Sequence, residues 1–381
     1  MIMNVLFISA SKYPSNSAEA SRLHYLAQLF AEDNHVTIIS RGSASSSYKR
    51  IEHISVSNKK LITGNVLLRA LDYLLFIKQV KKYLKNSKQV DAIVVCAMPT
   101  SVLKYLITYA KCNQILLIHD AVEWYSPEEF RLGKLDKLYR KKDLWMRKLL
   151  PGNCRIISIS RYLQKYFDGL GNKTVYVPSM IDTTLYNVLE KNYDGKIRLV
   201  YAGTPLKKDY LAVALKGIAL LSQEQIARLE VRIIGISKEQ AQKNGISTEV
   251  INKLGDSLVF MGRIPREQVF EYLEAAHFSI LLRPADQRYA KAGFPTKVPE
   301  SLSVGTPVIC NFSSDLGDFL SDGIDCIEVN SCSEKDMKIA VERVLNLNEV
   351  ELRRLSVNAR KLAANRFDYR LFIPEVRSIL E

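Results

Sequence analysis

A Gly- and Pro-rich segment that contains one carboxylate, residues 293–309 (GFPTKVPESLSVGTPVI), carries the strongest chemical signal in this chain. Its loop leads into a short predicted helix, whose first backbone N–H groups could bind a diphosphate. Glu300 lies one turn inside that helix, where a carboxylate can accept hydrogen bonds from a vicinal diol such as a ribose. The alternative is a solvated helix residue, but Glu300 stands between the apolar Val298 and Leu302, which favours a binding role.

A second candidate loop, residues 202–209 (AGTPLKKD), follows a β-branched run. Gly203 lies just past the predicted strand, and Lys207 and Lys208 lie at the mouth of the next predicted helix. Backbone N–H groups and ammonium charges in this arrangement suit a phosphate. Taken alone, the segment favours an ordinary loop with surface lysines. It supports a phosphate site only in combination with other motifs.

Motifs of other chemistries are missing from the sequence. The first predicted βα turn, Ser9–Ala20, lacks the GxGxxG of dinucleotide-binding enzymes, which argues against an NAD-dependent dehydrogenase. No helix-turn-helix, RRM or KH signature indicates nucleic-acid binding. The six cysteines form no CxxC pair and no Cys/His cluster has metal-ligand spacing, so we expect a reduced protein that needs no metal.

These segments need a scaffold, and 381 residues of which 47% are hydrophobic suffice for two medium-sized domains with full cores. Short β-branched runs alternate with helical stretches, which is the pattern of βαβ units and mainly parallel sheets. The predicted strands are Asn4–Ser9, Val36–Ser40, Ala92–Cys96, Ile115–His119, Ile156–Ile159 and Thr174–Val177, then Lys196–Ala202, Glu230–Ile234, Leu258–Met261, Phe278–Leu282 and Pro307–Cys310. Predicted helices include Ala18–Ala31 and Tyr210–Leu221, and the tail from Ser333 has the pattern of two helices with a break near Phe367.

The polar stretch Asp182–Gly195 separates the two series and is the predicted linker. We therefore expect an α/β protein with two doubly wound domains, and a ligand between them, because such sheets bind at the carboxyl ends of their strands. The N-terminus has no basic leader, so its apolar run is a predicted strand rather than a signal peptide. No stretch reaches the roughly 18 to 20 uninterrupted apolar residues of a membrane span.

Four segments together resemble glycosyltransferase family 4, the retaining, nucleotide-sugar-dependent enzymes of the GT-B fold. They are residues 293–309, 201–209 (YAGTPLKKD), 118–126 (IHDAVEWYS) and 177–182 (VPSMID). The resemblance covers essentially the whole chain and is closest to members that build bacterial capsule or other surface polysaccharides. It implies two Rossmann-like domains facing a central cleft: an acceptor domain of residues 1–185, to which a C-terminal helix near 367–381 crosses back, and a donor domain of residues 186–366.

The resemblance also implies roles for individual residues in the donor site. Glu300 would hold the ribose hydroxyls, and Lys208, less strongly Lys207, would contact the diphosphate from the loop of Gly203 and Thr204. The backbone would contact the base at Arg263 and Ile264, and the sugar and phosphates at Gly293, Phe294, Pro295 and Thr296. No metal is then required.

In the first domain, the resemblance implies that His119 faces the transferred sugar and the acceptor. A structural histidine at a strand end is the alternative. Its neighbour Asp120 and the nearby Glu123 could position the acceptor, or could equally pair with Arg and Lys residues. Ser17 and Ala18 stand where the family often has a glycine pair, and we assign Ser17 to the acceptor side.

Two positions depart from the family pattern. Ala292 replaces the first Glu of the Glu-x7-Glu pair, and Thr204 replaces the Arg that usually follows the loop glycine. A cation for the diphosphate is thus missing from its expected place. We hypothesise that it comes from one of four basic residues nearby in sequence, namely Arg283, Arg288, Lys291 and Lys297.

The net charge of +14 is distributed unevenly. Residues 1–190 contain 27 Lys and Arg against 15 Asp and Glu, a net of +12, which leaves +2 for the remainder. Two segments concentrate the charge, residues 59–88 and 131–148, with leucines and aromatic residues interleaved. Such a pattern can lie on an anionic bilayer, although core packing with solvated lysines would look the same.

We expect a cytoplasmic enzyme, peripheral on the inner face of the cell membrane, that transfers a sugar from a nucleotide-sugar to a lipid-linked glycan acceptor. The resemblance implies front-face attack, in which the leaving phosphate takes the acceptor proton. The alternatives are an inverting GT-B transferase and a non-catalytic subunit that binds a sugar nucleotide. The first is the alternative among enzymes, and the second follows from the departures at Ala292 and Thr204.

Overall fold

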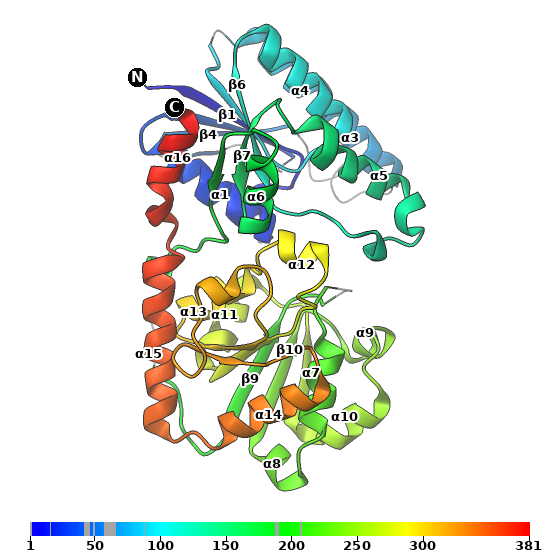
Figure 1. Cartoon of the computed structure of the whole chain (residues 1–381), viewed down its shortest axis with the longest axis vertical. Coiled ribbons are helices and arrows are strands. Elements are labelled where there is room, and N and C mark those ends of the chain that lie inside the picture. Colours follow the sequence, from blue (N-terminus) through cyan, green and yellow to red (C-terminus); the bar gives the residue numbers. More distant parts are fainter. Residues whose placement is uncertain are drawn as a thin grey trace. The chain divides into compact units, whose positions relative to one another are not determined.

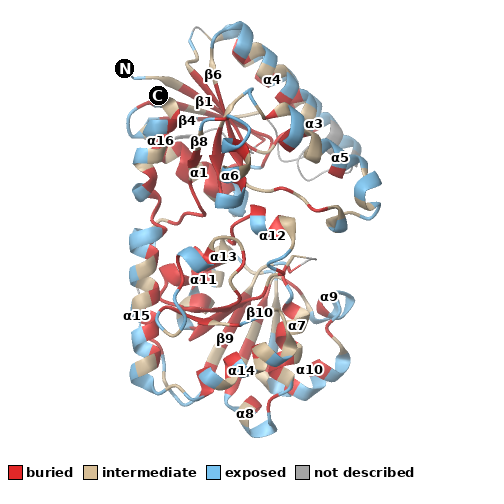
Figure 2. Ribbon diagram, in the orientation of Figure 1, coloured by how far each residue is buried: buried red, intermediate tan, exposed pale blue. Residues whose placement is uncertain are grey.

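The computed structural model describes residues 2–15, 17–41, 46–48, 50–56, 66–87, 89–186, 190–205 and 208–381 (Figure 1). The chain divides into two compact units. The first contains Met1–Met180 together with Tyr369–Glu381, and the second contains Ile181–Asp368. Both are layered α/β structures in which the strands are buried and the helices expose one face (Figure 2).

The first unit contains an eight-stranded sheet of order β3-β4-β2-β1-β5-β6-β7-β8, parallel except where β3 pairs with β4. Its strands are β1 (Asn4–Ser9), β2 (His35–Ser40), β3 (Ser46–Tyr48), β4 (Ile51–Ser55), β5 (Ala92–Val95), β6 (Leu116–Ala121), β7 (Arg155–Ser158) and β8 (Thr174–Tyr176). Its helices are α1 (Ala18–Ala31), α3 (Val66–Asn86), α4 (Thr100–Cys112), α5 (Lys137–Leu144), α6 (Arg161–Asp168) and α16 (Ile373–Leu380). Such parallel strands are buried on both faces, which is why they are nearly continuous runs of Val, Ile and Leu.

Contacts of the C-terminal residues place them in the first unit. The ring of Tyr369 stacks on Tyr25 of α1 at 5.3 Å. Arg155 donates to the carbonyl of Ile379 over 2.7 Å, and Ile379 is fully buried. Helix α16 therefore belongs to the core formed by α1, β7 and β8.

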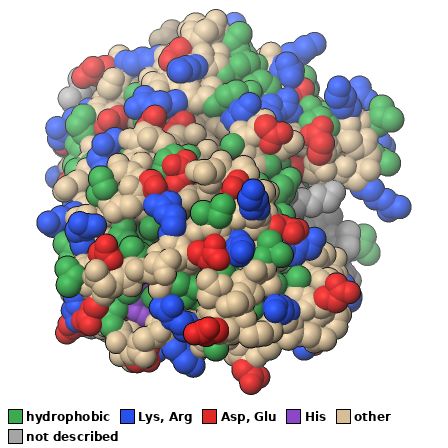
Figure 3. All heavy atoms as spheres, turned by 60° about the horizontal axis from the view of Figure 1, so that its bottom comes forward, with side chains coloured by type: hydrophobic (Ala, Val, Ile, Leu, Met, Phe, Trp, Pro, Cys, Tyr) green, Lys and Arg blue, Asp and Glu red, His purple; other side chains and the backbone are tan. Residues whose placement is uncertain are grey.

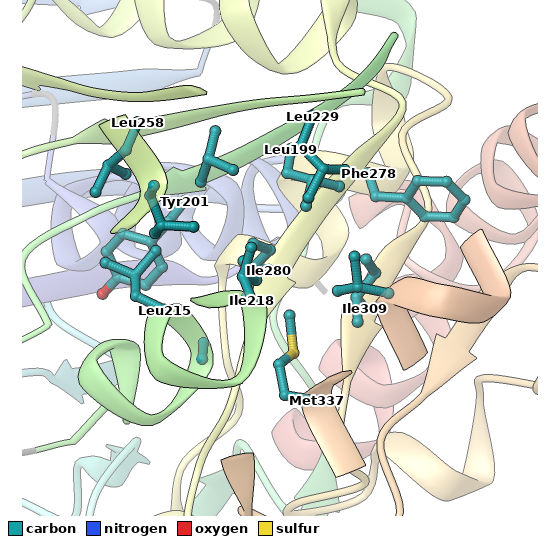
Figure 4. Packing of buried hydrophobic residues seen from close by; sticks show 14 of the residues in the cluster. Leu199, Tyr201, Leu215, Ile218, Leu229, Leu258, Phe278, Ile280, Ile309 and Met337 are labelled. Carbon is teal, nitrogen blue, oxygen red and sulfur yellow. The ribbon is translucent and has the colours of Figure 1, made fainter. Parts of the chain in front are cut away.

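The second unit contains a six-stranded, fully parallel sheet of order β11-β10-β9-β12-β13-β14. Its strands are β9 (Ile197–Ala202), β10 (Leu229–Ile234), β11 (Leu258–Gly262), β12 (Phe278–Leu281), β13 (Val308–Cys310) and β14 (Cys326–Glu328). Its helices are α7 (Leu211–Ala219), α8 (Gln223–Ala227), α9 (Lys238–Lys243), α10 (Thr248–Leu254), α11 (Arg266–Ala275), α12 (Arg288–Ala292), α13 (Lys297–Ser303), α14 (Glu334–Leu345) and α15 (Glu349–Arg366). Figure 4 shows Ile218 of α7 and Met337 of α14 beside the strand residues Leu199, Ile280 and Ile309 in one buried cluster.

The strand order of the second unit reverses between β9 and β12. At such a switch point the loops after the two strands diverge to opposite faces of the sheet and leave room for a ligand at the carboxyl ends. The loops in question are the one after Ala202 and the one after Leu281. This geometry places residues 203–205, 208 and 209, together with Arg283, at the edge where a doubly wound sheet binds its ligand.

Every predicted strand is present within two residues of its predicted bounds. Three short strands were not predicted: β3, β4 and β14. The tail contains the expected break near Phe367, but a second break at residues 346–348 separates α14 from α15, because Asn348 caps a new helix by accepting a hydrogen bond from the Glu351 N–H. No helix within the described ranges is long and apolar enough to span a bilayer.

Candidate active site

The loop after β9 owes its path to two glycines. Gly203 has φ +142°, donates its N–H to the carbonyl of Ile234 over 2.8 Å, and lies so close to Gly235 that a Cβ there would be 2.3 Å from the Gly203 oxygen. A Cβ on Gly203 itself would lie 2.5 Å from Cε of Lys297. The glycine therefore gives the Lys297 side chain its passage across the end of β9.

Three donors converge on the buried carboxylate of Asp209. Arg283 donates from Nε to Oδ1 over 2.8 Å, Tyr201 donates from its hydroxyl to Oδ2 over 2.8 Å, and Lys297 donates to Oδ2 as well. Lys297 also lies 2.7 Å from the Tyr201 hydroxyl oxygen and 4.1 Å from the centre of its ring. One anion thereby joins strand β9, the loop after β12 and helix α13. We call the four residues Asp209, Arg283, Tyr201 and Lys297 the Asp209 cluster.

The charges of the Asp209 cluster do not cancel. Burial tends to raise the pKa of Asp209, but the charges of Lys297 and Arg283 lower it to about 2, so the group is a carboxylate at neutral pH. Burial lowers the pKa of Lys297, and the Asp209 charge opposes that effect. With both cations charged, one positive charge remains at the switch point of the sheet.

Arg283 and Lys297 are two of the four cations in our hypothesis, and the structure brings these two together. Arg283 is fixed at its backbone by Asn311, which accepts from the Arg283 N–H over 2.9 Å and donates to its carbonyl over 2.7 Å. Within the described ranges, only Nε of the guanidinium has a hydrogen-bond partner. The other two candidates, Arg288 and Lys291, lie on α12 outside this cluster.

Glu300 of α13 is paired with Arg266, the first residue of α11. Nη2 of Arg266 donates to Oε1 of Glu300 over 2.8 Å, and the two side chains are 22% and 20% exposed. Glu300 and Lys297 also line a cavity of about 10 Å³, room for one water, under the ends of β9, β12 and β13. Glu300, the predicted partner of the ribose, and Lys297 of the Asp209 cluster therefore lie on one short helix.

The remaining donor residues lie around this edge of the second unit. Thr204 and Arg263 are exposed, Ile264 is half-buried after β11, and Lys208 lies 6.0 Å from the ring centre of Tyr289. Gly293, Pro295 and Thr296 form the turn into α13, whereas the Phe294 ring is buried against Phe319 and Phe367. Phe294 can therefore offer a ligand only its backbone. Lys207 lies outside the described residues.

His119 lies at the carboxyl end of β6 in the first unit and is 6% exposed. Burial, then the charge of Lys142, lowers its pKa to about 3, while a hydrogen bond to the Val95 backbone opposes the shift. The imidazole is therefore neutral at physiological pH. Nδ1 is buried and has no hydrogen-bond partner among the described residues, and the Trp145 ring lies edge-on at 5.8 Å.

Asp120 has a structural partner. Nε of Arg22 lies 3.0 Å from both carboxylate oxygens, and Nη2 lies 2.8 Å from Oδ1. The same guanidinium donates to the carbonyls of Val177 and Pro178 over 3.0 and 2.9 Å. Arg22 thus links α1 to the carboxyl ends of β6 and β8. Asp120 therefore pairs with an arginine, which was the alternative to a role in positioning the acceptor.

Glu123 and Ser17 lie near the same edge. The charges of Glu123 and Glu19 oppose the effect of burial, which lowers the pKa of Lys142. Burial and the carboxylate of Glu123 raise the pKa of Tyr125. Ser17 is the N-cap of α1 and accepts from the Ala20 N–H over 3.2 Å. Charged and hydroxyl groups therefore gather at this edge, Glu19 and Lys142 among them.

Sequence reasoning missed Asp209, Tyr201, Arg266 and Arg22. Asp209 directly follows the lysines of the candidate loop, and its only sequence signal was that position. The partners of the other three are 8, 34 and 98 residues away along the chain. In the part of the chain that the structure describes, no group of three or more His, Cys, Asp or Glu side chains could hold a metal ion.

Known proteins resemble this chain in sequence and in fold. Residues 187–362 match the family model described as glycosyl transferases group 1. Comparison with curated protein sequences finds no match. Sucrose-phosphate synthase from Thermosynechococcus elongatus superposes with a TM-score of 0.74 at 15% identity, over 99% of this chain and 98% of that one.

Two further solved structures superpose over nearly the full length. HepE of Anabaena, in complex with UDP and glucose, gives a TM-score of 0.69 at 14% identity and 99% coverage of both chains. WaaG, a glycosyltransferase involved in lipopolysaccharide biosynthesis, gives 0.69 at 16% identity, over 98% of this chain and 99% of that one. The fold class is thus GT-B, with two Rossmann-like α/β units. Residues 187–362 are a glycosyl transferases group 1 domain, and the chain is a glycosyltransferase.

Proposed function

We propose that this enzyme transfers a sugar, with retention of configuration, from a nucleotide-sugar donor held by the second unit. The observation that carries the proposal is the convergence of Arg283 and Lys297 on Asp209 at the switch point between β9 and β12. The residual positive charge of this cluster suits the diphosphate of such a donor, as do the guanidinium nitrogens of Arg283 that have no hydrogen-bond partner among the described residues. Arg283 then supplies the cation that Thr204 does not.

Cleavage of a glycosyl phosphate develops positive charge on the sugar and negative charge on the leaving diphosphate. Arg283 and Lys297 are fixed before the donor arrives, so they stabilise that negative charge without reorganising. Glu300 would accept hydrogen bonds from the ribose, and Lys208 would add charge at the mouth of the loop. No metal takes part in this proposal, and activity should survive a chelator.

In the first unit, neutral His119 would orient the sugar and the acceptor hydroxyl by hydrogen bonding. The bond between the anomeric carbon and the acceptor oxygen forms on the face from which the phosphate oxygen departs. The acceptor proton goes to that phosphate oxygen, so the step needs no protein base. His119→Ala should reduce turnover severely while the fold remains intact, and near-normal turnover would contradict this role.

A thermal-shift panel of UDP-, GDP-, dTDP- and ADP-sugars identifies the donor, because a ligand that binds only the native state raises the melting temperature. HepE was solved with UDP and with UDP-glucose, so UDP-glucose is the first donor to test. Arg283→Met and Lys297→Met should each weaken donor binding by about ten- to a hundredfold, as expected for a lost charge-assisted contact. Lys216→Met, which removes a cation from the exposed pair with Glu334, is the matched control.

Product analysis distinguishes this proposal from an inverting transferase and from a non-catalytic binding subunit. The anomeric configuration of the product by NMR distinguishes retention from inversion. Donor hydrolysis or transfer by the purified protein distinguishes an enzyme from a subunit that only binds a sugar nucleotide. Loss of donor binding in both Met variants, with binding kept in Lys216→Met, supports the site; unchanged binding in both would rule it out.

We also propose that the enzyme acts at the inner face of the cell membrane on a lipid-linked glycan of a surface polysaccharide. Residues 131–141, which we call the leucine-lysine surface, expose Leu132, Leu135 and Leu138 by 64%, 77% and 56%. Arg131, Lys134, Lys137, Arg140 and Lys141 are exposed among them. Apolar side chains beside lysines suit the boundary of an anionic bilayer, where each cation contributes about 1 kcal/mol.

Helix α3 offers a second surface of this kind. Leu67, Leu71 and Leu74 are exposed by 79%, 44% and 64%, whereas Phe76, Val80 and Leu84 are buried. Its exposed lysines are Lys78, Lys81, Lys82 and Lys85; Lys59, Lys60 and Lys88 lie outside the described residues. On the face that Figure 3 shows, basic and acidic side chains are interspersed.

Sedimentation with vesicles tests the membrane proposal. Wild type should bind vesicles of phosphatidylglycerol and phosphatidylcholine, and binding should fall when Leu132, Leu135 and Leu138 are changed to Ser or when Lys78, Lys81, Lys82 and Lys85 are changed to Glu. Leu220, Ile324 and Val350, exposed in the second unit, provide the matched Ser control. Equal binding by all variants would contradict docking through these surfaces.

A further inference from the structure

We infer that Arg266 is a positioning residue for the donor ribose: it holds Glu300 by one carboxylate oxygen, so that the other oxygen is presented to the vicinal diol. The inference rests on the proposed function, because it takes Glu300 as the ribose ligand. It adds a residue, outside the motifs of the sequence, that sets how strongly the enzyme prefers a ribonucleotide donor.

The geometry of the pair is asymmetric. Nη2 of Arg266 donates to Oε1 of Glu300 over 2.8 Å, and Oε2 has no hydrogen-bond partner among the described residues. Both side chains are about four-fifths buried, so water screens the pair less than it screens a surface pair. A vicinal diol can therefore bind Oε2 while the ion pair stays in place.

Arg266 is itself held by aromatic packing. Its guanidinium carbon lies 5.1 Å from the ring centre of Phe270, one turn further along α11. Phe270 is buried and stacks on Tyr186 with centroids 4.2 Å apart and planes 12° apart. Tyr186 comes from the chain that enters the second unit, so this segment fixes Phe270, Phe270 fixes Arg266, and Arg266 fixes Glu300.

A carboxylate held in this way loses little rotamer freedom when the donor binds, which is the gain of preorganisation. Without Arg266, Glu300 can rotate away from the diol, and the ribose hydroxyls contribute less to binding. A nucleotide that lacks the 2′-hydroxyl already forgoes part of this contact. Loss of Arg266 should therefore weaken binding of the ribonucleotide more than binding of the deoxyribonucleotide.

Calorimetric titration with UDP and with 2′-deoxy-UDP tests the inference. Arg266→Met should weaken UDP binding by about tenfold, the size of one charge-assisted hydrogen bond, and should reduce the preference for UDP over 2′-deoxy-UDP. In turnover the change should appear in KM for the donor, with kcat nearly unchanged. Arg266→Lys should restore part of the preference, and Tyr186→Leu should shift it in the same direction as Arg266→Met by a smaller amount.

Two variants make the outcome decisive. Arg343→Met, which removes an equally long cation from the exposed pair with Asp322, should leave the preference unchanged. The double variant Glu300→Gln, Arg266→Met should have the same preference for UDP over 2′-deoxy-UDP as Glu300→Gln alone, because Arg266 acts through Glu300. If Arg266→Met kept the wild-type preference for UDP over 2′-deoxy-UDP, the inference would be overturned. Unchanged UDP binding in Glu300→Ala would instead overturn the assignment of Glu300 to the ribose.

Discussion

Nε of Arg283 lies 2.8 Å from Oδ1 of Asp209, an aspartate whose side chain is 3% exposed. The second carboxylate oxygen of Asp209 accepts from Lys297 and from Tyr201. One buried anion thus fixes two cations of the second unit, one from the loop after β12 and one from helix α13. The positive charge that the donor site needs is held in place by a residue that does not itself attract the donor.

Removal of the Asp209 charge should destabilise the second unit. Asp209→Asn leaves Arg283 and Lys297 close together and partly buried without an anion, so the free energy of unfolding should fall by about 3–5 kcal/mol. Urea denaturation measures the loss.

Asp322→Asn is the control for that measurement, because it removes the anion of the exposed Arg343 pair. An exposed pair contributes at most about 1 kcal/mol. A loss as small as this for Asp209→Asn would show that the cluster does not depend on its anion.

Gly203→Ala should displace Lys297. The new Cβ would lie 2.5 Å from Lys297 Cε and 2.7 Å from Nζ, at a backbone φ of +142° that side chains rarely adopt. Gly203→Ala should therefore lose about as much donor affinity as Lys297→Met. Gly245→Ala is matched for a positive φ, +90°, but its Cβ would meet nothing within 4 Å, so it should lose stability without losing donor affinity. Equal donor affinity in the two variants would contradict the close contact.

The pair of Arg22 and Asp120 predicts a structural rather than a catalytic phenotype. Arg22→Met leaves a buried carboxylate and two buried carbonyls without their donor, so the free energy of unfolding should fall by about 3–5 kcal/mol. Combining it with Asp120→Leu should recover part of the loss, because the unpaired charge is removed. If Asp120→Leu alone kept full stability yet lost turnover, the aspartate would be catalytic instead.

The parts of the fold that the sequence predicts well are those where pattern alone decides. Strand β1 and helix α1 match their predicted bounds because a run of buried apolar residues and the cap Ser17 define them locally. Strand β14 has only three residues and was missed, since its pairing with β13 depends on residues far along the chain. Strand β4 was missed because polar residues, among them His53, interrupt its apolar pattern.

The candidate site follows the same division. Glu300, Lys297 and Arg283 were named from their place beside turns and strand ends. Which of four nearby cations would be brought together could not be known, because the choice depends on Asp209, a residue whose burial only the folded sheet determines. The partner of Glu300 was equally hidden, since Arg266 reaches it only after α11 packs against α13.

Lys191 should make the stability of the second unit depend on pH. Its ammonium group is buried and donates to the carbonyls of Glu274 and Ala276 over 2.9 and 2.6 Å and to Oγ1 of Thr306 over 2.7 Å. Burial lowers its pKa to about 7, although the charge of Glu274 opposes the shift. In the unfolded chain the same lysine titrates near the usual pKa of about 10.4.

Between about pH 7 and pH 10.4 the unfolded state therefore binds more protons at this site than the folded state, so the contribution of Lys191 to the free energy of unfolding should rise with pH, by at most about 1.4 kcal/mol per pH unit. Burial, then the charge of Lys191, lowers the pKa of the neighbouring His277 to about 4, so that group does not titrate in this window. Burial raises the pKa of the thiols of Cys310, Cys326 and Cys332, which contribute with the opposite sign in wild type and variant alike. In urea titrations at pH 7, 8 and 9, the free energy of unfolding should therefore change with pH more positively in wild type than in Lys191→Met. The same slope in both proteins would mean that the ammonium group keeps its ordinary pKa in the fold.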